Sequence, residues 1–427
     1  MSAAEFDSIP DALADIKKGK MVVVIDDPHR ENEGDLVMAA EKTTAKAVNF
    51  MARHGCGLIC VPMKAAHLDR LKIDPMVSDA NCGPVPGRDT AFSVSVDAVK
   101  DTTTGISAAD RAATIQRLID PASGPNDFIR PGHIFPLRAK NGGVLVRTGH
   151  TEAAVDLSRL AGLHPSGVIC EIMNPDGKMA RVPELLKFAN KHGLKIITIK
   201  ALIEYRHTHE QLIERQVSTR LPTPFGDFTL HVFEETLSGK QHLAMVMGEV
   251  DGAKDVLVRV HSSCLTGDTL FSLRCDCGNQ LASALRSIAR EKKGVLVYLS
   301  QEGRGIGLVK KLQAYVLQDK GLDTVEANQA LGFKPDLREY GIGAQILANL
   351  GLSTIRIMTN NPRKIVGIGG FGLKVVGRVP IQIPANRHNE RYIKTKQAKM
   401  GHLLELGPVL HTHFSLTETP SAKRKKK

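Results

Sequence analysis

Three of the seven cysteines, Cys264, Cys275 and Cys277, lie close together in the sequence. Clustered cysteines in a chain without secretory features are typical of a metal site rather than of a disulfide framework. Three thiolates leave one position of a tetrahedral zinc free for water, whose pKa zinc lowers to about 7. The alternative is three small buried side chains at a strand–helix junction. The clustering favours a catalytic zinc.

A glycine-rich turn follows the cysteines. Residues 295–299 (VLVYL) predict a buried strand, 302–307 (EGRGIG) a turn, and 308–318 a helix. Backbone N–H groups at such a junction can bind phosphate, here with Arg304 in the loop. Most glycine turns only reverse the chain, but this one neighbours the predicted zinc site. The combination indicates hydrolysis of a phosphorylated substrate.

A different kind of cluster lies near the N-terminus. Residues 26–35 (DDPHRENEGD) are rich in carboxylates, which suit a hard divalent cation such as magnesium and suit a solvated acidic turn equally well. Residues 130–157 then supply two histidines, His133 and His150, and two arginines, Arg138 and Arg147, and Glu171 follows the apolar stretch 167–170. These groups together favour metal and phosphate binding over the solvated turn.

The elements that must position these residues predict an α/β (or α+β) protein of two domains, each a mixed sheet with packed helices. We expect an amphipathic helix near residues 9–16, a helix over 312–321, and a charged, helical connection over 204–220. Strands are expected at the following ranges: 21–26, 144–147, 167–170, 221–235, 256–261 and 354–358. The tail after residue 402 lacks periodicity and predicts disorder.

Composition narrows the class of protein. Hydrophobic residues make up 42% and charged residues 24%, which is typical of a soluble globular protein, and no apolar run is long enough to span a membrane. The formal net charge is +12, of which residues 423–427 (KRKKK) contribute five charges. The chain has no tryptophan and few aromatic residues, so it lacks the stacking groups typical of single-strand binders. We therefore expect anionic small substrates, no nucleic acid, no membrane, and a reducing, cytoplasmic location.

The second half resembles GTP cyclohydrolase II over roughly residues 220–402. The motifs that carry the resemblance, in chain order, are RVHSSCLTGD, SLRCDCG, QEGRGIG, LQDKGLDTVEAN, PDLREYGIGAQIL and TNNPRKIVG. The resemblance implies that Cys264, Cys275 and Cys277 bind zinc. It also implies that Asp336 accepts a proton, that Arg338 is the nucleophile, and that Tyr315 assists. From its chemistry alone, an arginine is better suited to an electrostatic role, because its cation has no free lone pair.

The same resemblance implies a set of GTP-binding residues. They are Arg259, Val260, His261, Ser262, Ser263, Gln280, Glu302, Gly303, Arg304, Thr324, Thr359 and Lys364.

The first half resembles 3,4-dihydroxy-2-butanone-4-phosphate synthase over roughly residues 5–205. The motifs are RENEGDL, HGCGLIC, TAFSVSVDA, TTTGISAADRAATI, DFIRPGHIFPLRA, RTGHTEAAVDL and CEIMNPDGKMAR. The resemblance implies that Glu31 and His150 bind magnesium or manganese and that His133 and Glu171 are catalytic. It further implies that D-ribulose 5-phosphate contacts Arg30, Glu31, Asp35, Arg147, Thr148, Gly149, His150, Thr151 and Glu171.

Together the two halves resemble a bifunctional riboflavin-biosynthesis protein, a lyase fused to a hydrolase. The expected domains are 1–203 and 221–402, joined by the linker 204–220 and followed by a basic tail, 403–427. A homodimer is expected. One alternative is that only one half is active and the other is retained for structure. Another is that the chain is a basic GTP- or nucleic-acid-binding regulator that uses residues 423–427.

The chain departs from the family patterns at a few positions. Ser263 stands where the cyclohydrolase family usually has glutamate, and Asn279 stands where it often has glutamate. Loss of a carboxylate beside a metal ligand can lower metal affinity or activity by about 10–100-fold. The loop 81–91 (NCGPVPGRDTA) is bulkier and more basic than usual for the synthase family. The three cysteines, Asp336 and Arg338 all remain, so activity in both halves is still expected.

Overall fold

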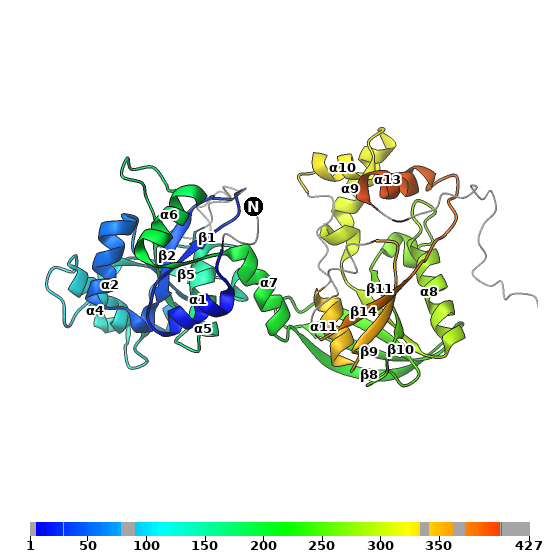
Figure 1. The fold of residues 1–427 in the computed structure, drawn as a ribbon, viewed down its shortest axis with the longest axis horizontal. Coiled ribbons are helices and arrows are strands. Elements are labelled where there is room, and N and C mark those ends of the chain that lie inside the picture. The colour runs from blue at the N-terminus through cyan, green and yellow to red at the C-terminus, as the bar shows by residue number, and fades with distance from the viewer. Residues whose placement is uncertain are drawn as a thin grey trace, which may run out of the picture. The chain divides into compact units, whose positions relative to one another are not determined.

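The computed structural model describes residues 6–28, 30–77, 90–333, 341–361, 372–401 and 403. The chain divides into two compact units, Met1–Arg206 (unit 1) and His207–Lys427 (unit 2), which are described separately. Each unit contains a seven-stranded sheet with packed helices (Figure 1). No helix among the described residues is both long and apolar enough to cross a membrane.

The elements of unit 1 alternate between strands and helices. Its strands are β1 (Val22–Ile25), β2 (Gly34–Ala39), β3 (Cys60–Lys64), β4 (Val96–Ala98), β5 (Phe128–Ala139), β6 (Gly167–Glu171) and β7 (Lys195–Thr198). Its α-helices are α1 (Ile9–Lys17), α2 (Ala45–Phe50), α3 (Ala65–Arg70), α4 (Ala108–Ile119), α5 (His150–Leu160), α6 (Val182–His192) and α7 (Ile199–His209), whose last residues belong to unit 2. Short helical turns complete the unit: η1 (Ala40–Lys42), η2 (Met51–Gly55), η4 (Pro125–Asp127) and η5 (Gly143–Leu145).

The sheet of unit 1 has the order β4-β5-β3-β6-β2-β1-β7 and is mixed, because only the β1–β7 and β3–β5 pairs are parallel. Alternate residues of β1 enter different cores, as a pleated strand requires. Val22 and Val24 pack with α1, α5 and α7, whereas Val23 and Ile25 pack with α2, α4 and α6. The sheet is therefore covered on both faces.

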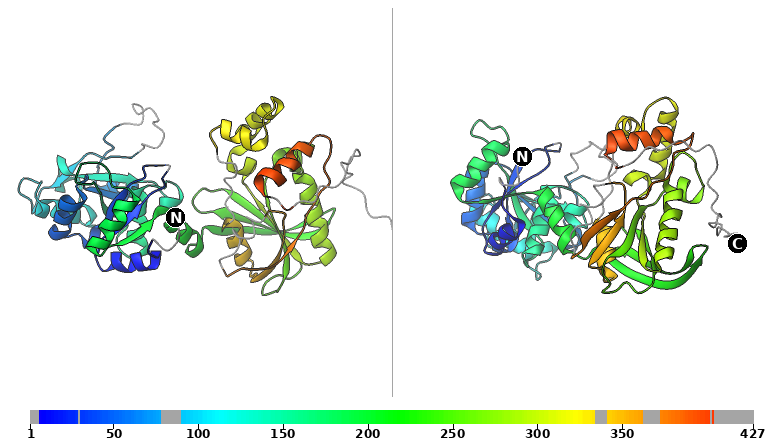
Figure 2. Two further views of the ribbon diagram at one scale, coloured as in Figure 1. Left: turned by 45° about the horizontal axis from the view of Figure 1, so that its top comes forward. Right: turned by 45° about the vertical axis from the view of Figure 1, so that its right-hand side comes forward.

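Unit 2 has the strands β8 (Ile213–Thr223), β9 (Gly226–Glu235), β10 (Gln241–Met247), β11 (Val256–Ser262), β12 (Gly294–Leu299), β13 (Thr354–Met358) and β14 (Lys374–Val379). Its helical elements are η6 (Leu265–Thr269), α8 (Cys277–Glu291), η7 (Glu302–Gly305), α9 (Gly307–Asp319), α10 (Thr324–Ala330), α11 (Gly341–Asn349) and α13 (Glu390–Met400). The strand order is β14-β13-β11-β12-β10-β9-β8; strands β14 to β12 in this order are parallel and the remainder antiparallel. Helices α9, α10 and α13 lie together beyond one end of the sheet (Figures 1 and 2).

Two expected elements differ from the structure. Residues 144–147 are not a strand, because Gly143–Leu145 forms a 3₁₀ turn in which the Val144 N–H donates to Asp156 Oδ2 at 2.8 Å. The expected connection 204–220 is helical only to His209, and Ile213–Thr223 pairs with β9 as an edge strand. Because most side chains of β8 are exposed, its sequence has the charged character of a solvated helix. The other expected helices and strands are confirmed within the described residues.

Candidate active sites

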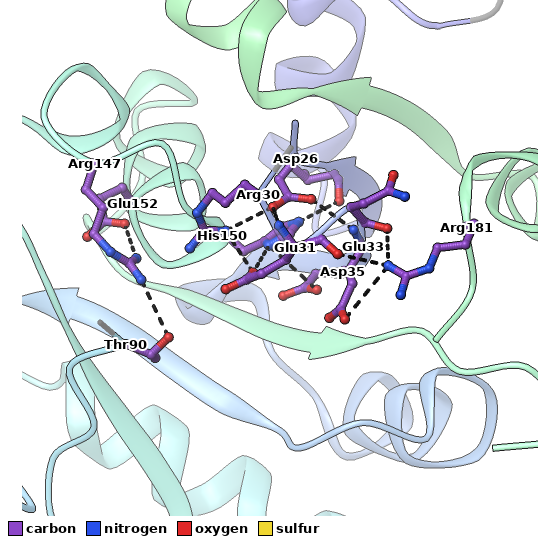
Figure 3. A network of polar contacts seen from close by, with 12 residues as sticks. Asp26, Arg30, Glu31, Glu33, Asp35, Thr90, Arg147, His150, Glu152 and Arg181 are labelled. Carbon is purple, nitrogen blue, oxygen red and sulfur yellow. Dashed lines mark hydrogen bonds and ion pairs between the residues drawn. The ribbon is translucent and has the colours of Figure 1, made fainter. Parts of the chain in front are cut away.

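The acidic loop of unit 1 is organised around the buried carboxylate of Asp26. Its oxygens accept the backbone N–H of Glu31 at 3.0 Å, the backbone N–H of Glu33 at 2.9 Å, and Arg30 Nη1 at 3.0 Å. Arg30 Nη1 also donates to Glu31 Oε2 at 2.7 Å. Asp26 therefore fixes the loop between β1 and β2, in which Glu31 lies beside His150 (Figure 3).

His150 is the first residue of α5 and is buried beside these carboxylates. Its Nε2 lies 3.1 Å from the Val24 carbonyl oxygen, and its Nδ1 lies 3.7 Å from Glu31 Oε2 and 3.9 Å from Asp35 Oδ1 (Figure 3). If Nε2–H donates to Val24, the lone pair of Nδ1 faces the carboxylates and is available to a metal.

Burial and mutual interaction shift the pKa values of Glu31, Asp35 and His150. The neighbouring His150 imidazole, together with Arg30, lowers the pKa of Glu31 to about 2. Burial raises the pKa of Asp35 to about 7. Burial opposes protonation of His150, but Asp35 and Glu31 outweigh it and raise its pKa to about 9. Closely spaced buried carboxylates of this kind are stabilised by a nearby cation.

The residues present fit a divalent ion. Ligand atoms of Asp26, Glu31 and His150 all lie within 4.8 Å of one another. Carboxylate oxygens and an imidazole are donors that magnesium and manganese accept. Our sequence analysis did not identify Asp26 individually; its place directly after a buried strand was the available signal. Because its oxygens already accept backbone N–H groups, Asp26 serves this centre chiefly by holding Glu31.

Glu171 lies on β6 and His133 on β5, which are separated by β3 in the same sheet. Glu171 pairs with Asp35 across β2 and β6, and its Oε2 accepts the Leu58 N–H at 2.8 Å. His133 Nδ1 lies 2.6 Å from Asp97 Oδ2, which leaves Nε2 as the ring nitrogen able to exchange a proton with a ligand. The sequence analysis missed Asp97, which is a single acidic residue in an otherwise apolar strand.

The predicted phosphate-binding turn 147–151 forms the start of α5. Gly149 is the N-cap residue and no side chain caps the helix, so its first N–H groups are available to an anion. Thr148 is exposed and Thr151 is buried. Arg147 donates to Glu152 Oε2 at 2.7 Å and reaches Thr90 Oγ1 at 3.5 Å (Figure 3). Arg138 instead pairs with Asp69.

In unit 2 the three cysteine side chains converge as predicted. Cys264 Sγ lies 3.7 Å from Cys275 Sγ, and the ligand atoms of all three cysteines lie within 4.8 Å of one another. A Cβ on Gly267 would stand 2.6 Å from Cys275 Sγ, so only glycine permits this approach. The six described cysteines form no disulfide. The thiol set fits zinc.

Lys311 on α9 is a charged neighbour of this cluster that the sequence analysis missed. Its Nζ lies 3.1 Å from Cys264 Sγ, 2.8 Å from Thr266 Oγ1 and 2.8 Å from Glu302 Oε1. Hydrogen bonds from the other two cysteines, together with Lys311, lower the pKa of Cys264. Lys311 and Tyr315 are four residues apart, so helical spacing places them on one face, which was the available signal.

Asp268 holds the loop that carries Cys264. Its carboxylate accepts the Cys264 N–H at 2.9 Å and the Tyr298 hydroxyl at 3.0 Å, and it lies 3.0 Å from His261 Nε2. His261, predicted to contact GTP, is therefore buried behind the loop and positions it.

A pocket opens beside the cysteines. Ten predicted residues line it, namely Ser262, Ser263, Cys264, Cys275, Cys277, Glu302, Gly303, Arg304, Tyr315 and Thr324. Charged or aromatic lining residues that the sequence analysis did not single out are Arg274, Lys311 and Tyr392. Gly303 and Arg304 both have left-handed backbone conformations, with φ of 63°.

Other predicted GTP-binding residues are not among those that line this pocket. Arg259 Nη2 donates to Gln280 Oε1 at 2.6 Å and Arg259 Nη1 donates to the Met358 carbonyl at 2.8 Å. Val260 is part of the core, and the buried Thr359 Oγ1 accepts the Asn361 N–H at 3.0 Å. Asp336, Arg338, Lys364, most of the loop 81–91 and most of the tail 403–427 lie outside the described residues.

Comparison with known proteins matches both units. The family model for 3,4-dihydroxy-2-butanone 4-phosphate synthase matches residues 10–205, and that for GTP cyclohydrolase II matches residues 214–380. The riboflavin biosynthesis protein RibBA of Endomicrobium trichonymphae is 57% identical over 400 residues, covering 94% of this chain and 98% of that protein. RibBA of Bacillus subtilis (strain 168) is 57% identical over 400 residues, covering 93% and 99%.

This chain belongs to the RibBA family. It is therefore a bifunctional enzyme of riboflavin biosynthesis that combines a synthase unit with a cyclohydrolase unit. Its fold is similar to that of RibBX, a two-domain 3,4-dihydroxy-2-butanone 4-phosphate synthase from A. baumannii, with a TM-score of 0.65 and 36% identity over 88% of this chain and 100% of that chain. The expected α/β class with two mixed sheets is confirmed.

Proposed function

We propose that unit 1 converts D-ribulose 5-phosphate to 3,4-dihydroxy-2-butanone 4-phosphate and formate. We propose that unit 2 hydrolyses GTP to 2,5-diamino-6-(5-phosphoribosylamino)pyrimidin-4-one, formate and pyrophosphate. The observation that carries both assignments is that each unit holds a different ligand set beside groups that bind phosphate. In unit 1, carboxylates and an imidazole lie at the start of α5. In unit 2, three thiols line the same pocket as Arg304 and Lys311.

In unit 1, Glu31 and His150 would hold magnesium or manganese, which when bound stabilises negative charge on substrate oxygens. Glu171 and His133 then move protons to and from substrate carbon and oxygen. Asp97 fixes the ring of His133 so that Nε2 exchanges the proton. The free N–H groups at the start of α5 bind the phosphate, and Arg30 holds Glu31 in place.

In unit 2, Cys264, Cys275 and Cys277 would hold zinc, which when bound activates water for attack on the guanine ring. Arg304 and Lys311 bring positive charge to the pocket that must receive the triphosphate. The Tyr315 hydroxyl lies 3.4 Å from Thr266 Oγ1, and its ring is covered by Arg274 at 4.7 Å, so the hydroxyl is directed toward the cysteine loop. Asp336 is proposed to accept a proton, and Arg338 is proposed to be the nucleophile that attacks the phosphate.

Formate release from each substrate, measured separately with each metal, tests the assignment. We expect D-ribulose 5-phosphate turnover to require magnesium or manganese and GTP turnover to require zinc. If only one substrate yields formate, the other unit is retained for structure alone. Deletion of residues 423–427 should leave both rates unchanged, whereas a nucleic-acid-binding regulator would lose its function. The homodimer and the cytoplasmic location remain predictions.

A further inference from the structure

Helix α13 follows the region matched by the cyclohydrolase family model, which ends at residue 380, yet it packs directly on the cysteine loop. Asn389 Nδ2, at the start of α13, donates to the Cys275 carbonyl oxygen at 3.4 Å. Lys396 Nζ donates to Asp276 Oδ1 at 2.6 Å, and both of these side chains are buried. The helix therefore holds the backbone of Cys275 and the side chain of Asp276, which lies between the predicted zinc ligands Cys275 and Cys277.

The far end of α13 is fixed to α10. Lys399 forms ion pairs with Asp323 and Glu326, which form the N-terminal cap of α10. Thr324, at the start of α10, lines the same pocket as the cysteines. Helix α13 thus contacts both the cysteine loop and α10, and it lies beside α9 and α10 (Figures 1 and 2).

Between these two attachments, Tyr392 faces the pocket. The Arg304 guanidinium carbon lies 5.8 Å from the centroid of the Tyr392 ring, and Lys396 Nζ lies 4.5 Å from it. A cation within about 6 Å of an aromatic face is attracted by the ring. Tyr392 therefore restrains the side chain of Arg304 from the α13 side.

Arg304 itself has unused hydrogen-bonding capacity. Its Nη1 is buried and has no hydrogen-bond acceptor within the part of the chain that the structure describes. A buried charged donor without an acceptor is costly, so such a group fits a ligand that supplies the missing oxygen. The backbone of Arg304 adopts a left-handed conformation, uncommon for a non-glycine residue and typical of binding sites.

We propose that Tyr392 is a positioning residue of the nucleotide pocket, which holds the Arg304 guanidinium so that Nη1 donates to an anionic oxygen of the GTP triphosphate. Helix α13 is then a functional wall of the cyclohydrolase site, kept in place by the Lys396–Asp276 and Asn389–Cys275 contacts. The inference rests on the proposed GTP hydrolysis by unit 2.

The test compares Tyr392→Leu with Tyr392→Phe in the full chain. Because Leu removes the aromatic face, the KM for GTP should rise about tenfold, whereas Phe keeps the ring and should match the wild type. The zinc content and the D-ribulose 5-phosphate rate should not change in either variant. Lys394→Ala is the matched control, since Lys394 is exposed on the same helix and pairs with Glu390 across one turn.

A double-mutant cycle with Arg304→Ala separates positioning from packing. If Tyr392 acts through Arg304, the double variant Arg304→Ala/Tyr392→Leu should have a KM for GTP less than twofold above that of Arg304→Ala alone. Additive effects of the two substitutions on the KM, or a rise in the KM in Tyr392→Phe as large as in Tyr392→Leu, would overturn the proposal. If Tyr392→Leu loses zinc, Tyr392→Met, which fills more of the space, replaces it in the cycle. Absence of GTP turnover in the wild type would instead overturn the proposed function of unit 2.

Discussion

Lys311 supplies a positive charge where three thiols and Glu302 lie close together. A zinc ion held by three thiolates would carry a net negative charge, which the Lys311 ammonium group, 3.1 Å from Cys264 Sγ, would offset. Glu302 in turn accepts the Leu265 N–H at 2.7 Å and so orients the cysteine loop. Single residues at this centre therefore act through the charge and direction of the ligands as well as through the substrate.

Lys311→Met should lower the affinity of unit 2 for zinc about 10–100-fold, because it removes a hydrogen bond to a ligand and leaves Glu302 without its cation. Competition with a chromophoric chelator measures this affinity. Lys310→Met is the control, since Lys310 is exposed on the same helix. Equal zinc affinity in the two variants would contradict the role given to Lys311.

Cys275→Ser should remove zinc and GTP turnover together, because a neutral hydroxyl is a poor zinc ligand. The D-ribulose 5-phosphate rate should stay near that of the wild type, since the ligands of the other metal lie in unit 1. Metal analysis alongside both formate assays checks this. GTP hydrolysis at the normal rate by zinc-free protein would disprove the zinc assignment.

Ser263→Glu restores the carboxylate that the cyclohydrolase family has before the first cysteine. Ser263 lines the pocket beside Cys264, and its backbone N–H donates to the Leu299 carbonyl at 2.8 Å, so a longer side chain would extend from a fixed position. We expect GTP turnover to rise or GTP binding to tighten. Unchanged or weaker GTP kinetics would show that this chain compensates elsewhere, with Asn279 the first position to test.

At the scale of elements, close approach between segments brings the proton-transfer groups of unit 1 together. Gly105 has φ of +89°, and a Cβ there would lie 2.1 Å from Asp97 Oδ2 and 2.6 Å from His133 Nδ1. The turn before α4 can approach β4 and β5 only because this residue has no side chain. The His133–Asp97 pair thus depends on a turn distant in sequence.

Gly105→Ala should reduce D-ribulose 5-phosphate turnover at least about 100-fold, because the added methyl group displaces the proton-exchanging histidine. GTP turnover should be unchanged. Gly177→Ala is the matched control, because Gly177 has φ of +81° with open space around its Cβ position and should cost only about 1 kcal/mol of backbone strain. If Gly105→Ala retains full synthase activity, His133 does not have the role proposed here.

At the scale of the whole molecule, two chemically different candidate ligand clusters lie in two separately packed units. Oxygen donors with an imidazole suit magnesium or manganese, and thiolates suit zinc. The two activities should therefore respond independently to metal removal.

After treatment with a strong chelator, both formate-releasing activities should be lost. Magnesium should then restore only D-ribulose 5-phosphate turnover, and zinc only GTP turnover. Parallel assays of one stripped sample, each with one metal added, make the comparison. Restoration of GTP turnover by magnesium alone would contradict the assignment of the thiol site.

The sequence by itself predicted the ligand types of both candidate sites. Residue type decides which ions and protons a side chain can bind, so the cysteine cluster and the acidic loop could be interpreted locally. The two-domain α/β organisation and most strands were also predictable, because apolar runs reflect the two faces of a sheet. Only the tertiary structure brings Asp97, Lys311 and Tyr392 to their sites, because each reaches its site from a separate element.

Where local patterns misled, contacts with other elements prevailed. Residues 144–147 have the composition of a strand but turn because Asp156 binds the Val144 N–H. Residues 213–223 have the charges of a solvated helix but form a strand because β9 supplies hydrogen-bond partners along their length. In each case the deciding partner is brought near only by folding, so tertiary hydrogen bonds outweigh local preference.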